Sequence, residues 1–130
     1  MARKNEEDEV RVLFVEDDPT VAQMYRLKLE LDGYSVDVAS DGEQAVSRAT
    51  SDPPDIIFLD IRLPKLDGLG VLQALRRHER TQQVPVVILS NYSERELVER
   101  GLKLGALEYL VKSQTTPAKV AGGVEDWLKT

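Results

Sequence analysis

The sequence has no cysteine and a single histidine among its 130 residues. Without cysteine the chain cannot form disulfide bonds, bind a metal through thiolates or use a cysteine nucleophile. The one histidine, His78, stands between Arg77 and Glu79 near the end of a predicted helix. We interpret it as a solvated charge rather than as a phosphohistidine, so the chemistry of this chain has to come from other side chains.

Long apolar segments and an excess of positive charge are also missing. No apolar run approaches the roughly 20 residues that span a bilayer, and residues 1–9 are too polar to form the apolar centre of a secretory signal. The formal net charge is −6, from 17 basic and 23 acidic side chains, and such a chain repels the phosphates of nucleic acids. These absences argue against a membrane partner and against direct nucleic-acid binding, and they favour a cytoplasmic location.

Length and composition indicate one globular domain. A chain of 130 residues fits a single hydrophobic core, and 42% hydrophobic with 31% charged residues is an ordinary balance for such a domain. Residues 1–9 predict a flexible polar lead-in, which leaves residues 10–130 as the domain. No internal repeat, low-complexity tract or linker marks a second domain.

Short apolar runs alternate with helical patterns along the domain. The runs are short, and several are rich in valine and isoleucine with little polar alternation, as is typical of strands buried on both faces of a parallel sheet. We predict strands at residues 10–15, 34–39, 55–60, 85–90 and 107–111.

A helical pattern follows each predicted strand. Residues 18–19 (Asp-Pro) supply a helix cap and a first-turn proline, and Gly33 ends this first helix. The Asp-Gly pair at residues 41–42 opens the second helix, which stops before two prolines. The apolar face of the first helix is predicted to consist of Val21, Met24, Leu27, Leu29 and Leu31.

Three more helices complete the pattern. A leucine-rich stretch over residues 69–75 marks the third, and Ser93 with Glu96 predicts a capping box for the fourth. The fifth opens at residues 116–117 (Thr-Pro). Residues 122–123 (Gly-Gly) lie inside the fifth helix, where each glycine costs about 1 kcal/mol relative to alanine, so we expect a kink or fraying there.

Five strands that alternate with five helices predict an α/β domain whose parallel sheet is covered on both faces. Right-handed crossover connections leave few topologies for such a chain. We therefore predict a flavodoxin-like, doubly wound, five-stranded parallel sheet with five helices. The strand order 2-1-3-4-5 is the one known for that fold.

Polar groups follow four of the predicted strands. The first run stops at Glu16 and Asp17, and three others stop at Asp60, Ser90 and Lys112. Because open α/β sheets bind ligands at the carboxyl ends of their strands, we expect these side chains to meet there. Clustered carboxylates repel one another unless a hard cation such as Mg²⁺ neutralises them, and an aspartate can form an acyl phosphate. The cluster is therefore a candidate site for Mg²⁺ and a phosphoryl group.

Over nearly its whole length, residues 10–128, the chain resembles the receiver domain of a two-component response regulator. The resemblance is carried by residues 15–18 (VEDD), 59–68 (LDIRLPKLDG), 88–90 (ILS) and 105–112 (GALEYLVK), in the order and spacing of the family. It implies a phosphoprotein of phosphorelay signal transduction with a chemotaxis-regulator-like fold. Such a domain is no enzyme towards other substrates, because it catalyses only its own phosphorylation and dephosphorylation.

The resemblance implies a role for each acid of the cluster. Asp60 resembles the aspartate that accepts a phosphoryl group from a sensor histidine kinase or a phosphotransfer protein. Asp17 resembles the direct Mg²⁺ ligand, and Glu16 its acidic partner, which acts through water. Arg62 is expected to give its backbone carbonyl to the metal.

The resemblance also implies a switch. Ser90 resembles the hydroxyl that moves to meet the phosphoryl group, Lys112 the lysine that pairs with it, and Tyr109 the aromatic residue whose rotamer reports the shift. Such coupling biases the surface made by the fourth helix, the fifth strand and the fifth helix. This surface is expected to bind a downstream protein partner or an output domain, or to form a phosphorylation-dependent homodimer.

The chain departs from the family around this site. Ser113 follows Lys112 where the family usually has proline in a cis peptide, so either a costly cis bond is retained or the loop takes another path. The residue after the switch hydroxyl is Asn91, where the family often has a small residue, and Tyr92 follows it. We expect Tyr92 and Arg62 to flank the phosphorylation pocket and to slow the attack of water on the acyl phosphate.

Other functions remain as alternatives. A pseudo-receiver keeps the fold for binding without phosphorylation, although acids, hydroxyl and lysine are all present here. An aspartyl phosphatase typically carries a second aspartate where this chain has Arg62, which argues against hydrolysis of outside substrates. The sequence has no Gly-x-x-x-x-Gly-Lys loop, which argues against nucleotide hydrolysis. A flavin-binding domain of similar fold remains an alternative, although the chain lacks a phosphate-binding loop after the first strand. Because no output domain follows in the sequence, the chain is either a stand-alone receiver or a fragment of a longer regulator.

Overall fold

Five strands form a single parallel sheet in residues 9–130, the part of the chain that the structure, a computed structural model, describes. The predicted lead-in, residues 1–9, lies outside the described residues except for Glu9. The strands are β1 (Arg11–Val15), β2 (Ser35–Ala39), β3 (Ile56–Leu59), β4 (Val86–Ser90) and β5 (Glu108–Val111).

The strands lie in the order β2-β1-β3-β4-β5, and every neighbouring pair is parallel. The predicted order is confirmed, and each observed strand begins one residue later than predicted. Consecutive strands are joined by helices, which are α1 (Pro19–Leu31), α2 (Gly42–Ser51), α3 (Gly68–Arg77) and α4 (Arg95–Lys103). After β5 come one 3₁₀ turn, η2 (Lys112–Gln114), and the last helix, α5 (Pro117–Lys129).

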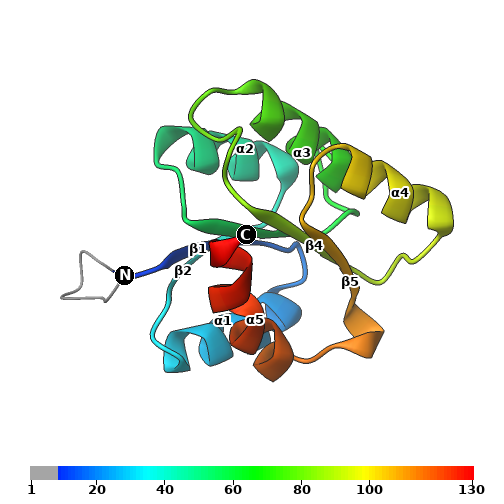
Figure 1. The fold of residues 1–130 in the computed structure, drawn as a ribbon. Coiled ribbons are helices and arrows are strands. Elements are labelled where there is room, and N and C mark those ends of the chain that lie inside the picture. Colours follow the sequence, from blue (N-terminus) through cyan, green and yellow to red (C-terminus); the bar gives the residue numbers. More distant parts are fainter. Residues whose placement is uncertain (1–8) are drawn as a thin grey trace.

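The helices cover the sheet on both faces. Helices α2, α3 and α4 lie on one face, and α1 and α5 lie on the other (Figure 1). The predicted flavodoxin-like, doubly wound fold is therefore confirmed. The longest helices, α1 and α5, have 13 residues each, and in residues 9–130 no helix has the length and apolar composition of a membrane span.

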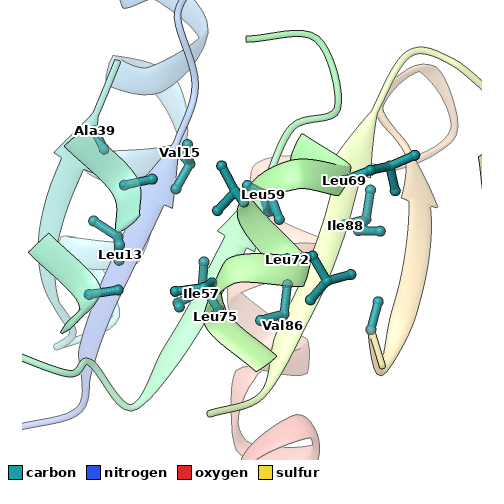
Figure 2. Packing of buried hydrophobic residues seen from close by; sticks show 14 of the residues in the cluster. Leu13, Val15, Ala39, Ile57, Leu59, Leu69, Leu72, Leu75, Val86 and Ile88 are labelled. Atoms are coloured by element: carbon teal, nitrogen blue, oxygen red, sulfur yellow. The ribbon is translucent and has the colours of Figure 1, made fainter. Parts of the chain in front are cut away.

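Side chains of each central strand point alternately to the two faces, because successive residues of a strand face opposite sides. In β1, Leu13 and Val15 pack towards α2 and α3, whereas Val12 and Phe14 pack towards α1 and α5. Figure 2 shows the first of these two layers, in which the leucines of α3 lie over the sheet. Both faces are apolar, which explains why these strands lack a polar alternation. The members labelled in the figure are Leu13, Val15, Ala39, Ile57, Leu59, Leu69, Leu72, Leu75, Val86 and Ile88.

Helix α1 carries two apolar stripes, and the predicted inner face is wrong for three of its five residues. Met24, Leu27 and Leu31 are exposed, with 50%, 53% and 81% of their surface accessible. Their spacing of three and four residues fits an inner face. The same spacing recurs two positions earlier, roughly half a turn away around the helix, so the sequence alone offers two candidate faces.

The stripe that faces the sheet consists of Ala22, Tyr25 and Leu29, all buried. The ring of Tyr25 stacks on Phe14 of β1 with ring centroids 5.0 Å apart. Aromatic side chains bury large apolar areas, and a stacked pair of rings adds a favourable contact beyond that burial. This contact, rather than the periodicity, selects the inner face.

Side-chain caps begin four of the five helices, and the fourth is the exception. The predicted capping box of Ser93 and Glu96 is wrong: α4 begins at Arg95, with Glu94 at the cap position and no side-chain hydrogen bond to the first turn. Because α4 starts later than predicted, Ser93 falls in the preceding loop. The four capping side chains are Asp18, Asp41, Asp67 and Thr116.

Helix α5 is unbroken through residues 122–123, so the predicted fraying at the glycine pair is wrong. Val120 and Val124 are fully buried on either side of the pair. Near the end of the helix, Trp127 lies edge-on to Phe58 at 5.6 Å between ring centroids, and its Nε1 donates to Glu108 Oε1 over 2.6 Å. These anchors on both sides offset the low helix propensity of glycine.

The two stripes of α1 can be tested with a matched pair of variants. We expect Leu29→Ala to lower the free energy of unfolding by about 2–5 kcal/mol, because it leaves a cavity in the core. Leu31→Ala, two residues away on the exposed stripe, is expected to change it by less than about 0.5 kcal/mol. Urea unfolding of both variants measures the difference, and equal losses would contradict the orientation of α1.

Candidate functional site

Three charged side chains that are far apart in the sequence meet at the carboxyl edge of the sheet. Lys112 Nζ lies 2.8 Å from Asp60 Oδ2, and it also donates a hydrogen bond to Glu16 Oε1. Glu16 and Asp60 are buried, with 3% and 7% of their surface exposed, and only 12% of the Lys112 side chain is exposed. The expected meeting of these strand ends is therefore observed for the two acids and the amine.

Asp17 completes a group of three carboxylates. Three carboxylate oxygens, one from each of Glu16, Asp17 and Asp60, lie within 4.8 Å of one another. Of these three residues, only Asp17 is exposed to solvent. Clustered carboxylate oxygens that open to water are the donor set that Mg²⁺ prefers, since it keeps several water ligands. The residues present therefore fit Mg²⁺. Arg62 stands in the loop directly after β3, two residues beyond Asp60.

Backbone donors hold the two buried acids. The N–H of Ile61 donates to Asp60 Oδ1 over 2.7 Å, which leaves Oδ2 to Lys112. The N–H of Asp18, at the cap of α1, donates to Glu16 Oε2 over 3.1 Å. Each acid thus has one oxygen bound to the backbone and the other bound to the same ammonium group, and this arrangement fixes both carboxylates in orientation.

Gly68 also belongs to this site, although the sequence analysis did not single it out. A Cβ atom at this position would overlap the carbonyl oxygen of Asp60 and lie 2.7 Å from the Cα of Ile61. The N–H of Gly68 donates to the carbonyl of Ile61 over 2.7 Å. The first turn of α3 therefore packs directly on the backbone of Asp60, and only glycine fits there. The Asp-Gly pair at residues 67–68 was the available signal.

Burial and charge act against each other at these groups. Burial raises the pKa of Glu16, and its bonds to Lys112 and to the Asp18 N–H offset this only in part. Burial would lower the pKa of Lys112, but the hydrogen bonds and charges of Asp60 and Glu16 outweigh burial, and its pKa is raised above 10.5. Lys112 therefore stabilises the fold fully below about pH 10.5, and this contribution is lost as the pH rises through its folded pKa.

Ser90 and Tyr109 belong to β4 and β5, which lie on the side of β3 opposite to β1. Ser90, the last residue of β4, is fully buried, and its Oγ accepts a hydrogen bond from the N–H of Tyr92 over 3.2 Å. The hydroxyl of Tyr109 donates to the carbonyl oxygen of the same Tyr92, and burial raises the pKa of Tyr109. The two expected switch residues therefore both hold the backbone of Tyr92.

Arg62 and Tyr92, which were expected to flank the pocket, are in direct contact. The guanidinium carbon of Arg62 lies 4.4 Å from the centroid of the Tyr92 ring, a cation–π distance. After Lys112, the backbone forms the η2 turn with Ser113 at its centre, and no cis peptide bond occurs in residues 9–130. Of the two paths expected for this loop, the trans path is the one observed.

The sequence model of the response regulator receiver domain matches residues 12–120 of this chain. The chain belongs to this family. Receiver domains are signalling modules of two-component systems rather than enzymes towards other substrates, and they interact with histidine kinases or phosphotransfer proteins.

Relatives of this receiver domain include transcriptional regulators and solved receiver structures. The regulator RpaA of Synechocystis sp., described as DNA-binding, is 40% identical over 78% of this chain and 42% of its own length. The regulator PhoP of Bacillus subtilis is 38% identical over the same shares. The chain thus spans about two-fifths of the length of these relatives.

A solved receiver domain also matches, that of a sensor histidine kinase from Pseudomonas aeruginosa. It is 30% identical, with a TM-score of 0.85 over 94% of this chain and 99% of its own. A magnesium ion is coordinated in the active-site cleft of that structure. The acidic pocket of the present receiver domain therefore has a magnesium-bearing counterpart in its own family.

The ion pairs of Lys112 predict a pH-dependent loss of stability when the lysine is removed. In Lys112→Met, measured with EDTA present, two buried carboxylates lose their cation, and we expect unfolding to cost about 3 kcal/mol less at pH 7. The pKa of Glu16, already raised by burial, rises further in the variant, so the folded state binds protons as the pH falls. The difference in the free energy of unfolding between the variant and the unsubstituted protein should therefore be smaller at pH 5 than at pH 7.

Urea unfolding at both pH values measures this gap. Lys119→Met, on an exposed position of α5, is the control for loss of a lysine without loss of an ion pair. A gap that stays constant or widens between pH 7 and pH 5 would contradict the assigned role of the two buried acids.

Proposed function

We propose that this receiver domain accepts a phosphoryl group on Asp60 from a phosphohistidine, in a reaction that depends on Mg²⁺. The observation that carries the proposal is the meeting of Glu16, Asp17, Asp60 and Lys112 at one edge of the sheet, with Ser90 at the end of the neighbouring strand. A phosphoacceptor needs one reachable carboxylate among groups that neutralise the charge of the phosphoryl oxygens.

Each of these residues has a separate role in the transfer. A carboxylate oxygen of Asp60 forms a bond to phosphorus while the bond between phosphorus and the histidine nitrogen breaks and the imidazole leaves. Lys112, which already bonds to Asp60, pairs with a phosphoryl oxygen. When bound, Mg²⁺ supplies further neutralisation of negative charge. Glu16, Asp17 and the carbonyl of Arg62 are the groups that we expect to hold it. Hydrolysis of the acyl phosphate by water then resets the domain.

We further propose that the surface of α4, β5 and α5 changes its binding of partners after phosphorylation. Tyr109 connects this surface to Ser90 through the backbone of Tyr92. Leu102 of α4 is exposed, at 45% of its surface, and an exposed leucine suits a protein partner or a second copy of the chain. The unphosphorylated domain should already sample some of the switched state.

The direct test is the mass of the intact protein after incubation with acetyl phosphate, with and without Mg²⁺. We expect a gain of one phosphoryl group that requires Mg²⁺ and is absent in Asp60→Asn, which keeps the shape of the side chain. Circular dichroism of the variant controls for folding. If the folded protein gains no phosphoryl group although Mg²⁺ binding is measured, the domain is a pseudo-receiver that binds partners without phosphorylation.

A second prediction concerns the lifetime of the phosphorylated state. The Tyr92 ring and the Arg62 side chain contact each other, and we expect the pair to flank the pocket and to slow the approach of water to the acyl phosphate. Tyr92→Ala should therefore release phosphate several-fold faster after the donor is removed. The rate is measured by the loss of the phosphorylated mass with time. An unchanged rate would contradict the role of Tyr92 in slowing the attack of water.

A further inference from the structure

We propose that the cation–π contact between Arg62 and Tyr92, which we call the clasp, connects the loop after β4 to the loop after β3. Arg62 is thereby a positioning residue for Ser90. We name residues 91–94 the switch loop and residues 61–67 the phosphoacceptor loop. The clasp itself is a property of the unphosphorylated protein. Its effect on signalling rests on the function proposed above.

The contact between the two loops is made by one side chain from each. Arg62 stacks over the ring of Tyr92 at 4.4 Å. No carboxylate among the described residues forms an ion pair with Arg62. Its cation is therefore held by the face of the tyrosine ring, which attracts it through the ring quadrupole.

Tyr92 transmits this contact to both switch residues through its backbone alone. Its N–H donates to Ser90 Oγ over 3.2 Å, and its carbonyl accepts from the hydroxyl of Tyr109. The ring of Tyr92 is therefore free to bind Arg62 while its peptide groups bind Ser90 and Tyr109. A shift of Ser90 Oγ towards a phosphoryl group on Asp60 either breaks its hydrogen bond from the Tyr92 N–H or moves a residue that Arg62 restrains.

Helix α4, which follows the switch loop, offers little alternative restraint. It has no side-chain cap hydrogen bond, and its one buried residue is Gly101. This glycine lets the helix approach the sheet closely, because a Cβ there would lie 2.5 Å from Ile88 Cδ1 and 3.5 Å from the Tyr109 ring. Leu97 is the α4 side chain that packs, partly buried, against the core cluster, and no side chain of the helix is fully buried. The contact of Tyr92 with Arg62 is therefore a substantial part of what restrains the switch loop.

The clasp can be tested without phosphorylation, by hydrogen exchange of the Tyr92 amide that donates to Ser90 Oγ. Rates are corrected for intrinsic exchange, and urea unfolding controls for global stability. We expect about fivefold faster exchange in Arg62→Ala and in Tyr92→Leu, the factor that corresponds to one exposed cation–π contact. Tyr92→Phe keeps the ring and both backbone bonds, so it should exchange at the original rate.

The double variant Arg62→Ala with Tyr92→Leu decides whether the two side chains act as a unit. A clasp predicts that it exchanges no faster than either single variant, because each already removes the contact. Multiplying effects would overturn the clasp, and so would unchanged exchange in Arg62→Ala.

The effect on the switch is measured by the rate at which acetyl phosphate and Mg²⁺ phosphorylate Tyr92→Leu and Tyr92→Phe. Both keep Arg62, so attraction of the anionic donor is unchanged between them. We expect Tyr92→Leu to react several-fold faster, because a freed switch loop populates the reactive arrangement more often. Equal rates would overturn the positioning role. If no variant is phosphorylated while exchange responds as expected, the proposed function fails and the clasp stands.

Discussion

The buried ion pairs of Lys112 are the interaction on which the rest of this site depends. Two carboxylates lie almost completely out of water at the edge of the sheet, and one ammonium group bonds to both. Leaving either acid buried without a cation would cost several kcal/mol. The three residues come from the ends of β1, β3 and β5, so the interaction holds only while these strands keep their order and register.

This electrostatic constraint also bears on the phosphoryl transfer proposed above. A single lysine faces two buried acids, and burial raises the pKa of Glu16 in spite of its hydrogen bond to Lys112. A group of three carboxylates with one exposed member therefore favours an additional cation from solvent. The charge imbalance would be unfavourable in an ordinary core, but it fits the function proposed above, in which Mg²⁺ and Lys112 together accommodate an added phosphoryl group.

Rigid and loosely held parts lie side by side around Asp60. On one side, Gly68 packs the first turn of α3 against the backbone of Asp60, and the capped helices α1, α2 and α3 surround the acids. On the other side, α4 has no side-chain cap and buries only Gly101. A local charge change at a rigid centre can shift a neighbouring element only if that element is weakly restrained. In the proposed function, the fold thus places the phosphoacceptor in the rigid part and the responding surface in the weakly restrained part.

Much of the fold followed from local patterns. Short Val- and Ile-rich runs and the Asp-Pro and Thr-Pro helix starts act within a few residues, so strands and three of the caps could be predicted. The capping box at Ser93 failed because the switch loop, held through Tyr92, delays the start of α4. The glycine pair in α5 does not break the helix, because buried valines on both sides restrain it.

The sequence by itself determined the fold class and which polar groups stand at the strand ends, because residue periodicity and the rules of parallel sheets act on any such chain. Only the tertiary structure decided which of two equally spaced stripes of α1 faces the core, since that choice rests on the Tyr25–Phe14 contact. It alone also decided that Lys112 bonds to both acids and that Arg62 lies on Tyr92. These contacts join distant segments, and their geometry depends on packing that no local pattern encodes.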